Sequence, residues 1–277
     1  ERGSERIMLE AVDILNERGE SLSLSLESHV EGYLVADIQG LDPVKASLSS
    51  TKSAGRDGTQ FQNAQRDDRN IVLTVGLVTD YVTNTVRGLR QALYGFVPPK
   101  SKVRLRFHVE GESSVEIWGV VEGFESTLFS AEPQVEISII CNDPDFSDVA
   151  PTVVSGNSVA TSVMSTLTYT GTSEVGFKLL VTVNRTIAGF TLYYTDSAGK
   201  PYTFEIKLAM VAGQKLEISS VEGNKYIRLN GSTSVLYAAS VNVEWPKITK
   251  GPNTFRVQVA GAALPYTLTY IGEHVGL

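Results

Sequence analysis

Three segments between Lys102 and Cys141 alternate apolar and polar residues, and this pattern constrains the fold more than any other feature of the chain. They read KVRLRFHV, VEIWGVV and VEISIIC. A period of two is typical of β-strands with one face on a core and one in water. Asp143-Pro144 then ends the last segment, because proline lacks a donor for a sheet ladder. The stretch predicts a rigid antiparallel meander, with lysines and arginines of one strand opposite glutamates of the next.

Length and composition indicate an ordinary globular chain. Its 277 residues suggest about two domains, at roughly 100–200 residues each. The net charge of −7 and the lack of a basic run argue against sequence-specific nucleic-acid binding and against anionic membranes. No apolar run approaches the ~20 residues that span a bilayer, and ERGSERIM has no apolar core of a signal peptide. We therefore expect no membrane segment and folding in a cytoplasm.

Residue types that carry catalysis are present, but not in patterns that perform it. His29, His108 and His274 lack metal-ligand spacing. Cys141 is the only cysteine, and its place in an alternating segment predicts a small buried side chain. No serine lies in a Gly-x-Ser-x-Gly elbow. We expect no catalytic residue, no metal site and no cofactor.

The first half of the chain predicts strands and a single helix. Residues 7–26 fit a strand hairpin better than a helix. An amphipathic stripe predicts the helix, with Thr83 or Asn84 as its cap; its apolar residues are Val82, Val86, Leu89 and Leu93. Residues 49–70 are polar and rich in Ser, Gly and Gln, which predicts a long loop that contacts a partner.

The second half predicts a β-sandwich or jelly roll. Residues 147–158 read as a linker, and beyond them short strands recur about every 8–12 residues between turns. The expected strands are Phe177–Val183, Thr191–Thr195, Tyr202–Ile206, Lys215–Ser219, Tyr226–Asn230, Ser240–Glu244, Thr254–Val259 and Thr267–Tyr270. We place the two domains at residues 1–148 and 149–277.

Several segments, in their order and spacing, resemble one protein family. In the first half they are Asp37–Pro43, Arg69–Leu73, Val121–Glu125 and Val135–Cys141, and in the second half Ala212–Ile218 and Trp245–Phe255. They resemble the distal tail proteins of long, non-contractile-tailed phages, whose C-terminal domain is galectin-like.

The resemblance implies a mainly β fold: a β-barrel-like or split-barrel N-terminal domain with one helix and an extended hairpin, and a C-terminal galectin-like β-sandwich. It also implies a structural virion protein, not an enzyme. Six copies would form a ring whose hairpins lap neighbouring copies, joining the tail tube to the tip or baseplate and its receptor-binding proteins. DNA would pass through the ring, and an acidic chain would limit phosphate contacts.

The same resemblance implies location at the tail tip of the virion, with assembly in the host cytoplasm. Two alternatives stay open. One is a carbohydrate-binding module used in host recognition, although the second domain lacks the His-x-Asn-x-Arg motif of galectins and Trp245 lies in a Glu-Trp-Pro turn. The other is a tail-tube subunit, against which the appended sandwich argues.

We expect copy or partner contacts in residues 49–70 and in a hairpin at residues 122–133. The predicted contact residues are Phe124, Leu128, Phe129, Trp118, Arg56, Gln60 and Phe61. The first three would be apolar anchors, unless they belong to the core. Trp118 follows Ile117 in an alternating strand and is expected to face away from the core.

Overall fold

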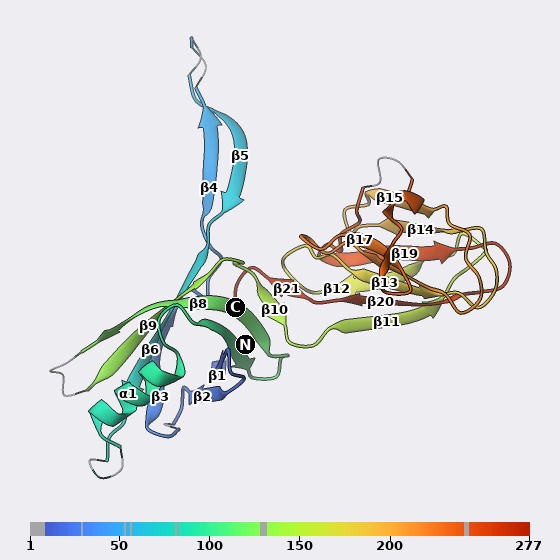
Figure 1. Ribbon diagram of the computed structural model, residues 1–277. Coiled ribbons are helices and arrows are strands. Elements are labelled where there is room, and N and C mark those ends of the chain that lie inside the picture. The colour runs from blue at the N-terminus through green and yellow to red at the C-terminus, as the bar shows by residue number, and fades with distance from the viewer. Residues whose placement is uncertain are drawn as a thin grey trace, which may run out of the picture. The chain divides into compact units, whose positions relative to one another are not determined.

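The computed structural model describes residues 9–28, 30–52, 54–55, 57–80, 82, 84–127, 132–240 and 244–277. The chain divides into two compact units. The first comprises Glu1–Val149 together with Val275–Leu277, and the second comprises Ala150–His274. Strands dominate both units, and the described residues contain a single α-helix, in the first unit (Figure 1). The expected mainly β fold is confirmed.

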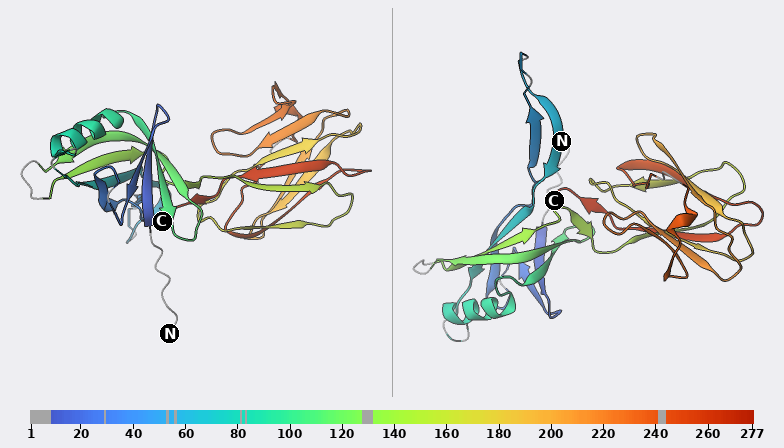
Figure 2. Two further views of the ribbon diagram at one scale, coloured as in Figure 1. Left: turned by 90° about the horizontal axis from the view of Figure 1, so that it is seen from below. Right: turned by 45° about the horizontal axis from the view of Figure 1, so that its top comes forward.

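The first unit is built from strands around the meander that the sequence predicts. Its elements are β1 (Leu9–Asn16), β2 (Ser21–Ser25), β3 (Tyr33–Gln39), β4 (Ala46–Thr51), β5 (Gln60–Arg66), β6 (Arg69–Leu77), α1 (Val86–Phe96), β7 (Lys102–Val109), β8 (Val115–Ser126), β9 (Gln134–Cys141) and β10 (Phe146–Asp148). Neighbouring strands of the main sheet are antiparallel, in the order β2-β1-β7-β8-β9-β6-β3. The sheet curls, as Figure 2 shows. Both the meander and the β1–β2 hairpin are confirmed.

One face of this sheet forms the core, as its alternation requires. Val103, Leu105 and Phe107 have no exposed surface, and full burial of each such side chain stabilises the fold by about 1.5–3 kcal/mol. On the opposite face Arg106 lies across from Glu116, which confirms the expected pairing of basic and acidic side chains. Cys141 is buried, also as expected.

The helix begins later than its apolar stripe indicates. Val82 lies outside α1 and is 86% exposed, so its expected place in the stripe is wrong. Thr85 caps the helix instead of Asn84, because its Oγ1 accepts a hydrogen bond from the backbone N–H of Gly88 at 3.1 Å. Thr83 lies outside the described residues.

Residues 46–66 form a two-stranded hairpin, which we call the arm, where the sequence predicts a loop. β4 and β5 pair with each other alone, and every residue of both strands is exposed. Figure 1 shows the arm projecting from the sheet of the first unit. The loop prediction is wrong because serine, threonine and glutamine serve an exposed strand as readily as a loop, so composition alone does not separate the two.

Arg69, the first residue of β6, fixes the base of the arm. It is 1% exposed. Its guanidinium donates hydrogen bonds to four backbone carbonyls, those of Gly40, Asp42, Pro144 and Val275. The group also lies 4.4 Å from the ring centroid of Phe146. Beside it, Arg66 of the arm forms an ion pair with Asp145. One buried cation thus connects three separate segments of the first unit.

The second unit consists of two sheets. Its elements are β11 (Thr152–Asn157), β12 (Ser165–Tyr169), β13 (Lys178–Thr182), β14 (Phe190–Thr195), β15 (Pro201–Ile206), β16 (Lys215–Ser219), β17 (Tyr226–Leu229), β18 (Thr233–Ser234), the 3-10 turn η1 (Leu236–Ala238), β19 (Gly251–Gln258), β20 (Pro265–Tyr270) and β21 (Glu273–His274). The sheets have the orders β11-β20-β13-β16-β17-β18 and β12-β19-β14-β15. Their inward residues share one apolar core, which is the arrangement of a sandwich.

Two details of the second half differ from the sequence prediction. The expected linker contains strand β11, whose residues pair with β20. The alternation of β11 is hard to recognise in the sequence because the strand is short and its exposed residues are mostly small and polar. A strand is expected at Ser240–Glu244, but neither of its end residues lies in a strand. Residues 241–243 lie outside the described part of the chain.

Candidate interaction surfaces

The arm has one apolar face and one polar face. Its cross-strand pairs place four apolar side chains together on one face, which we call the apolar stripe: Ala46, Leu48, Phe61 and Ala64. The same face also carries Ser50, opposite Phe61, and Arg66, opposite Ala46. The opposite face carries only uncharged polar side chains, those of Ser47, Ser49, Thr51, Gln60, Asn63 and Gln65. Paired residues of antiparallel strands point to the same side, so this division follows from the register.

A β-bulge creates the stripe. Ser49 pairs with Asn63 and Ser50 pairs with Phe61, so Gln62 is an extra residue on β5. In a regular ladder Gln62 would pair with Ser50, and Phe61 would pair with Thr51 on the polar face, away from Leu48. The local insertion therefore gathers every apolar side chain of the two strands on one side.

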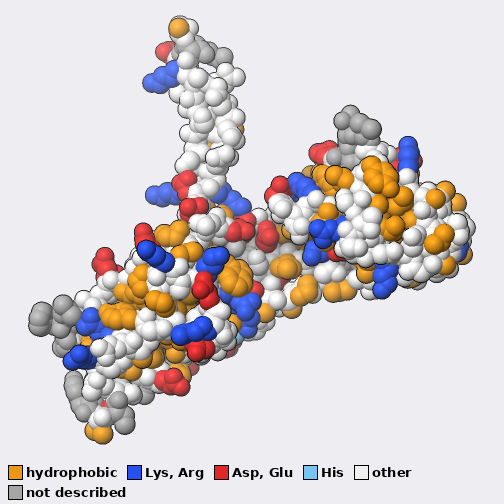
Figure 3. All heavy atoms as spheres, in the orientation of Figure 1, with side chains coloured by type: hydrophobic (Ala, Val, Ile, Leu, Met, Phe, Trp, Pro, Cys, Tyr) orange, Lys and Arg blue, Asp and Glu red, His pale blue; other side chains and the backbone are white. Residues whose placement is uncertain are grey.

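The stripe is uncovered in the single chain. Leu48 is 70% exposed and Phe61 is 63% exposed. An isolated two-stranded hairpin is marginally stable in water, and its outer edges have unpaired backbone groups. In Figure 3 the visible side of the arm is mostly white, from uncharged polar side chains and backbone, whereas orange side chains gather on the body of the first unit. The arm therefore leaves two large apolar side chains open to solvent.

A second apolar surface lies on the outward face of the main sheet. Trp118 is 59% exposed, which confirms that it faces away from the core. Val120 lies two residues further along β8 and pairs with Ile140 of β9, so all three point outward. We call Trp118, Val120 and Ile140 the outer patch.

Charged groups border the outer patch. The Arg104 guanidinium lies 5.1 Å from the Trp118 ring centroid, a cation–π contact that holds both side chains against the sheet. Glu116 accepts hydrogen bonds from Arg104 at 3.3 Å and from Arg106 at 3.2 Å. The patch is therefore a fixed aromatic and aliphatic surface, not a set of mobile side chains.

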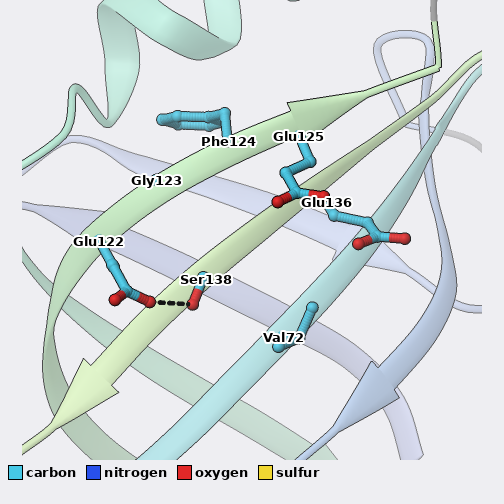
Figure 4. Close-up of a pocket in the computed structure, with 7 residues that line it drawn as sticks. All are labelled: Val72, Glu122, Gly123, Phe124, Glu125, Glu136 and Ser138. Atoms are coloured by element: carbon cyan, nitrogen blue, oxygen red, sulfur yellow. Dashed lines mark hydrogen bonds between the residues drawn. The ribbon is translucent and has the colours of Figure 1, made fainter.

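A shallow groove of about 430 Å³ adjoins the outer patch on β6, β8 and β9 (Figure 4). Its lining residues are Val72, Glu122, Gly123, Phe124, Glu125, Glu136 and Ser138. Glu122 accepts a hydrogen bond from the Ser138 hydroxyl at 2.8 Å. Glu125 lies directly opposite Glu136, and like charges in that position repel. The groove has an acidic wall, but within the described residues no three His, Cys, Asp or Glu side chains are grouped to hold a metal ion.

Phe124 belongs to the groove through its backbone, while its side chain packs on the other face of β8. Figure 4 shows the ring on the side of the helix, away from Glu122 and Glu136. The ring packs edge-on against Tyr94 at 5.0 Å between centroids and joins the core of the first unit. The contact that the sequence analysis expects at Phe124 stays a prediction, and it would use a half-buried ring.

The remaining predicted contact residues form two groups, those that the structure describes and those that it does not. Gln60 lies on the polar face of the arm and Phe61 on its apolar stripe. Arg56, Leu128 and Phe129 lie outside the described residues. Sequence reasoning missed Leu48, Val120 and Ile140 as surface residues. The signal for Leu48 was present, since Ala46 and Leu48 alternate with serines, but the bulge interrupts the matching pattern in β5.

The second unit carries an open groove of about 390 Å³ on β14, β15 and β19. The Arg256 guanidinium lies 4.1 Å from the Tyr193 ring centroid. Beside this pair are hydrogen-bonding side chains, those of Thr191, Glu205, Lys207 and Gln258. An aromatic ring with flanking polar groups is an arrangement that can bind a polar ligand.

Comparison with known proteins finds a family match within the first unit. A family model described as the phage tail protein RIFT-related domain matches residues 18–140. The fold of the chain matches the crystal structure of the Dit protein of phage SPP1, described as a paradigm of the hub adsorption apparatus in phages that infect Gram-positive bacteria. The TM-score is 0.71 at 11% identity, over 95% of this chain and 98% of that one. A search of curated proteins found no match.

Two structures of the phage P2 baseplate in its activated conformation are also similar. With calcium, the TM-score is 0.43 at 12% identity, covering 94% of this chain and 98% of that one. With strontium, it is 0.40 at 10% identity, covering 93% and 97%. These scores are too low to carry an argument.

No helix among the described residues is long and apolar enough to cross a membrane. Residues 18–140 are therefore similar to a phage tail domain, and the chain as a whole shares its fold with the SPP1 protein.

Proposed function

We propose that this chain, whose residues 18–140 match the phage tail protein RIFT-related domain, is the subunit of a ring at the distal end of a long, non-contractile phage tail. The ring holds six copies and joins the tail tube to the tip or baseplate. Receptor-binding proteins attach to that tip. The protein is carried in the virion at the tail tip and is assembled in the host cytoplasm.

The observation that carries this proposal is the arm. Its two strands are fully exposed, yet all their apolar side chains lie on one face. Such a hairpin gains stability when a neighbour covers that face. An arm that reaches from one copy to a different surface of the next is a heterologous contact, and heterologous contacts close into rings when the rotation allows.

Charge supports passage of DNA through such a ring. Acidic side chains outnumber basic ones, with a net charge of −7, which weakens the attraction between the chain and DNA phosphates. The acidic groove adds carboxylates at Glu122, Glu125 and Glu136 on one face of the main sheet. We further propose that the protein acts by shape, with no bond made or broken on its surface.

The test combines assembly in solution with location in the virion. The mass of the purified full chain is measured by light scattering across a range of concentrations, with chemical cross-linking. A variant in which Gly-Ser replaces residues 46–66 serves as the comparison. We expect a closed ring from the native chain and monomer from the variant, and labelled protein at the tail tip in electron micrographs. A native chain that stays monomeric, or label along the whole tail, would refute the proposal.

The groove of the second unit favours carbohydrate binding as a second candidate function. Tyr193, Glu205 and Gln258 give it an aromatic ring and hydrogen-bonding groups suited to sugar hydroxyls. The galectin-like character of this unit stays a prediction. Glycan-array binding by the full chain, lost in Tyr193→Ala, would support this function. Equal signals from both proteins, or no signal from either, would exclude this groove as a sugar site.

A further inference from the structure

We propose that the apolar stripe of the arm docks on the outer patch of a second copy of this chain. Leu48 and Phe61 would cover Trp118, Val120 and Ile140 of that copy. The inference rests on the proposed ring and adds to it the surface that receives the arm. It therefore predicts which side chains of two copies meet.

The shape of the two surfaces supports the pairing. The stripe is one side of a flat two-stranded ribbon, and the outer patch lies on the outward face of two paired strands, β8 and β9. Two sheet faces pack about 10 Å apart with interdigitating side chains. Large exposed side chains, Phe61 and Leu48 on one surface and Trp118 on the other, supply the interdigitation. Aromatic residues of this kind are typical anchors of interfaces.

Charge allows the same pairing. The stripe bears no charged side chain along Leu48, Phe61 and Ala64. Arg66 shares this face at the base of the arm, opposite Ala46, and is already paired with Asp145. Arg104 at the border of the patch forms an ion pair with Glu116, so its charge keeps a partner when the patch is covered. Covering Trp118 therefore leaves neither Arg104 nor Glu116 without a charged partner.

The small area of the arm contact indicates that the bound partner is a second copy of the chain within a closed assembly. Strands of six and seven residues at about 3.4 Å per residue give a ribbon face of roughly 20 Å by 10 Å, or about 200 Å². A stable interface of standard size buries about 800 Å² on each partner. One arm contact is therefore too small for an isolated pair. A ring in which each copy gives one arm and receives another closes every contact at once, which strengthens the assembly without enlarging the contact.

Disulfide trapping tests the pairing directly. One full-length sample carries Leu48→Cys, and another carries Trp118→Cys. Both positions are exposed, so neither change disturbs a core. The native Cys141 does not compete, because it is buried and burial raises the pKa of its thiol to about 12. The matched control replaces Leu48→Cys with Gln65→Cys, which lies on the opposite face of the same arm.

The two samples are mixed and oxidised gently, and cross-linked dimer is measured by mass spectrometry. A disulfide needs Cα atoms within about 7 Å, so we expect at least about tenfold more Leu48–Trp118 dimer than Gln65–Trp118 dimer. Phe61→Ser provides a second measurement, since it removes the largest side chain of the apolar stripe at an exposed position. Circular dichroism and thermal melting check that this variant folds, and we expect it to lose assembly.

The outcomes separate this inference from the proposed ring. If the native chain assembles and loss of residues 46–66 prevents it, but the Leu48 and Trp118 cysteines fail to cross-link, the arm binds elsewhere and the inference is overturned while the ring stands. Cross-linking of both arm cysteines to equal extent would also overturn it. A native chain that never self-associates would overturn both.

Discussion

Replacing Arg69 with methionine should be the most damaging single change at the base of the arm. The native guanidinium is 1% exposed and serves four backbone carbonyls. Methionine fills a similar volume but donates no hydrogen bond. Each carbonyl left without a partner in a buried site costs about 1–3 kcal/mol. These costs are not additive, because the segments relax together.

We therefore expect Arg69→Met to lower the free energy of unfolding of the first unit by about 3–5 kcal/mol, the range for breaking a buried charged network. The loss is comparable with the whole stability of many domains, about 5–15 kcal/mol. The effect has a spatial signature, because the four carbonyls belong to the segments around Gly40, Pro144 and Val275. Backbone amides of these segments should exchange hydrogen faster than those of β7.

Urea unfolding followed by tryptophan fluorescence measures the change unit by unit. The chain has two tryptophans, Trp118 in the first unit and Trp245 in the second. A Trp245→Phe background reports the first unit alone. The matched control is Arg18→Met, because Arg18 forms an exposed ion pair with Glu20 and such pairs contribute about 0–1 kcal/mol. An Arg69→Met loss no larger than that of the control would refute the argument from the four carbonyls.

Three further changes test other parts of the first unit. Thr85→Ala removes the helix cap and should cost about 1 kcal/mol, with faster hydrogen exchange at Gly88 as the local measure. Gly40→Ala should cost about 2–3 kcal/mol in urea unfolding, since φ is +88° and a Cβ would meet the Asn70 carbonyl; a change within error would contradict the strain. Burial raises the pKa of the Cys141 thiol from 9.0 to about 12, so its stabilising contribution is complete below pH 9.0 and is lost as the pH rises toward about 12. Alkylation at pH 8 should be at least about tenfold slower in the folded chain than in urea, since the thiolate reacts; equal rates would contradict burial.

The meander could be predicted from the sequence because its cause is local. Each of its strands packs one face on a core and exposes the other, so the period of two is written along each strand. The helix was predicted for the same reason, but its start was not. Val82 continues the apolar spacing by coincidence, and the boundary depends on which hydroxyl reaches a backbone N–H, a geometric question that Thr85 decides.

The arm and its base could not be predicted in this way. In the single chain both faces of the arm are exposed to water, so burial imposes no alternation of apolar and polar residues. The extra residue Gln62 also interrupts the weak alternation that β5 has. Arg69 depends on partners that lie 29, 75 and 206 positions away in the chain. Composition predicts a solvated arginine there, and only the fold brings together the carbonyls that bury it.

Arg69 also meets the carbonyl of Val275, and the N–H of Leu277 donates to the Leu41 carbonyl at 3.1 Å. The chain thus leaves the first unit at Val149 and comes back to it at Val275. In topological terms the second unit is inserted into the first, and the backbone connects the two units twice. A second unit attached in this way can be replaced by another without changing the strand order or the core of the first unit.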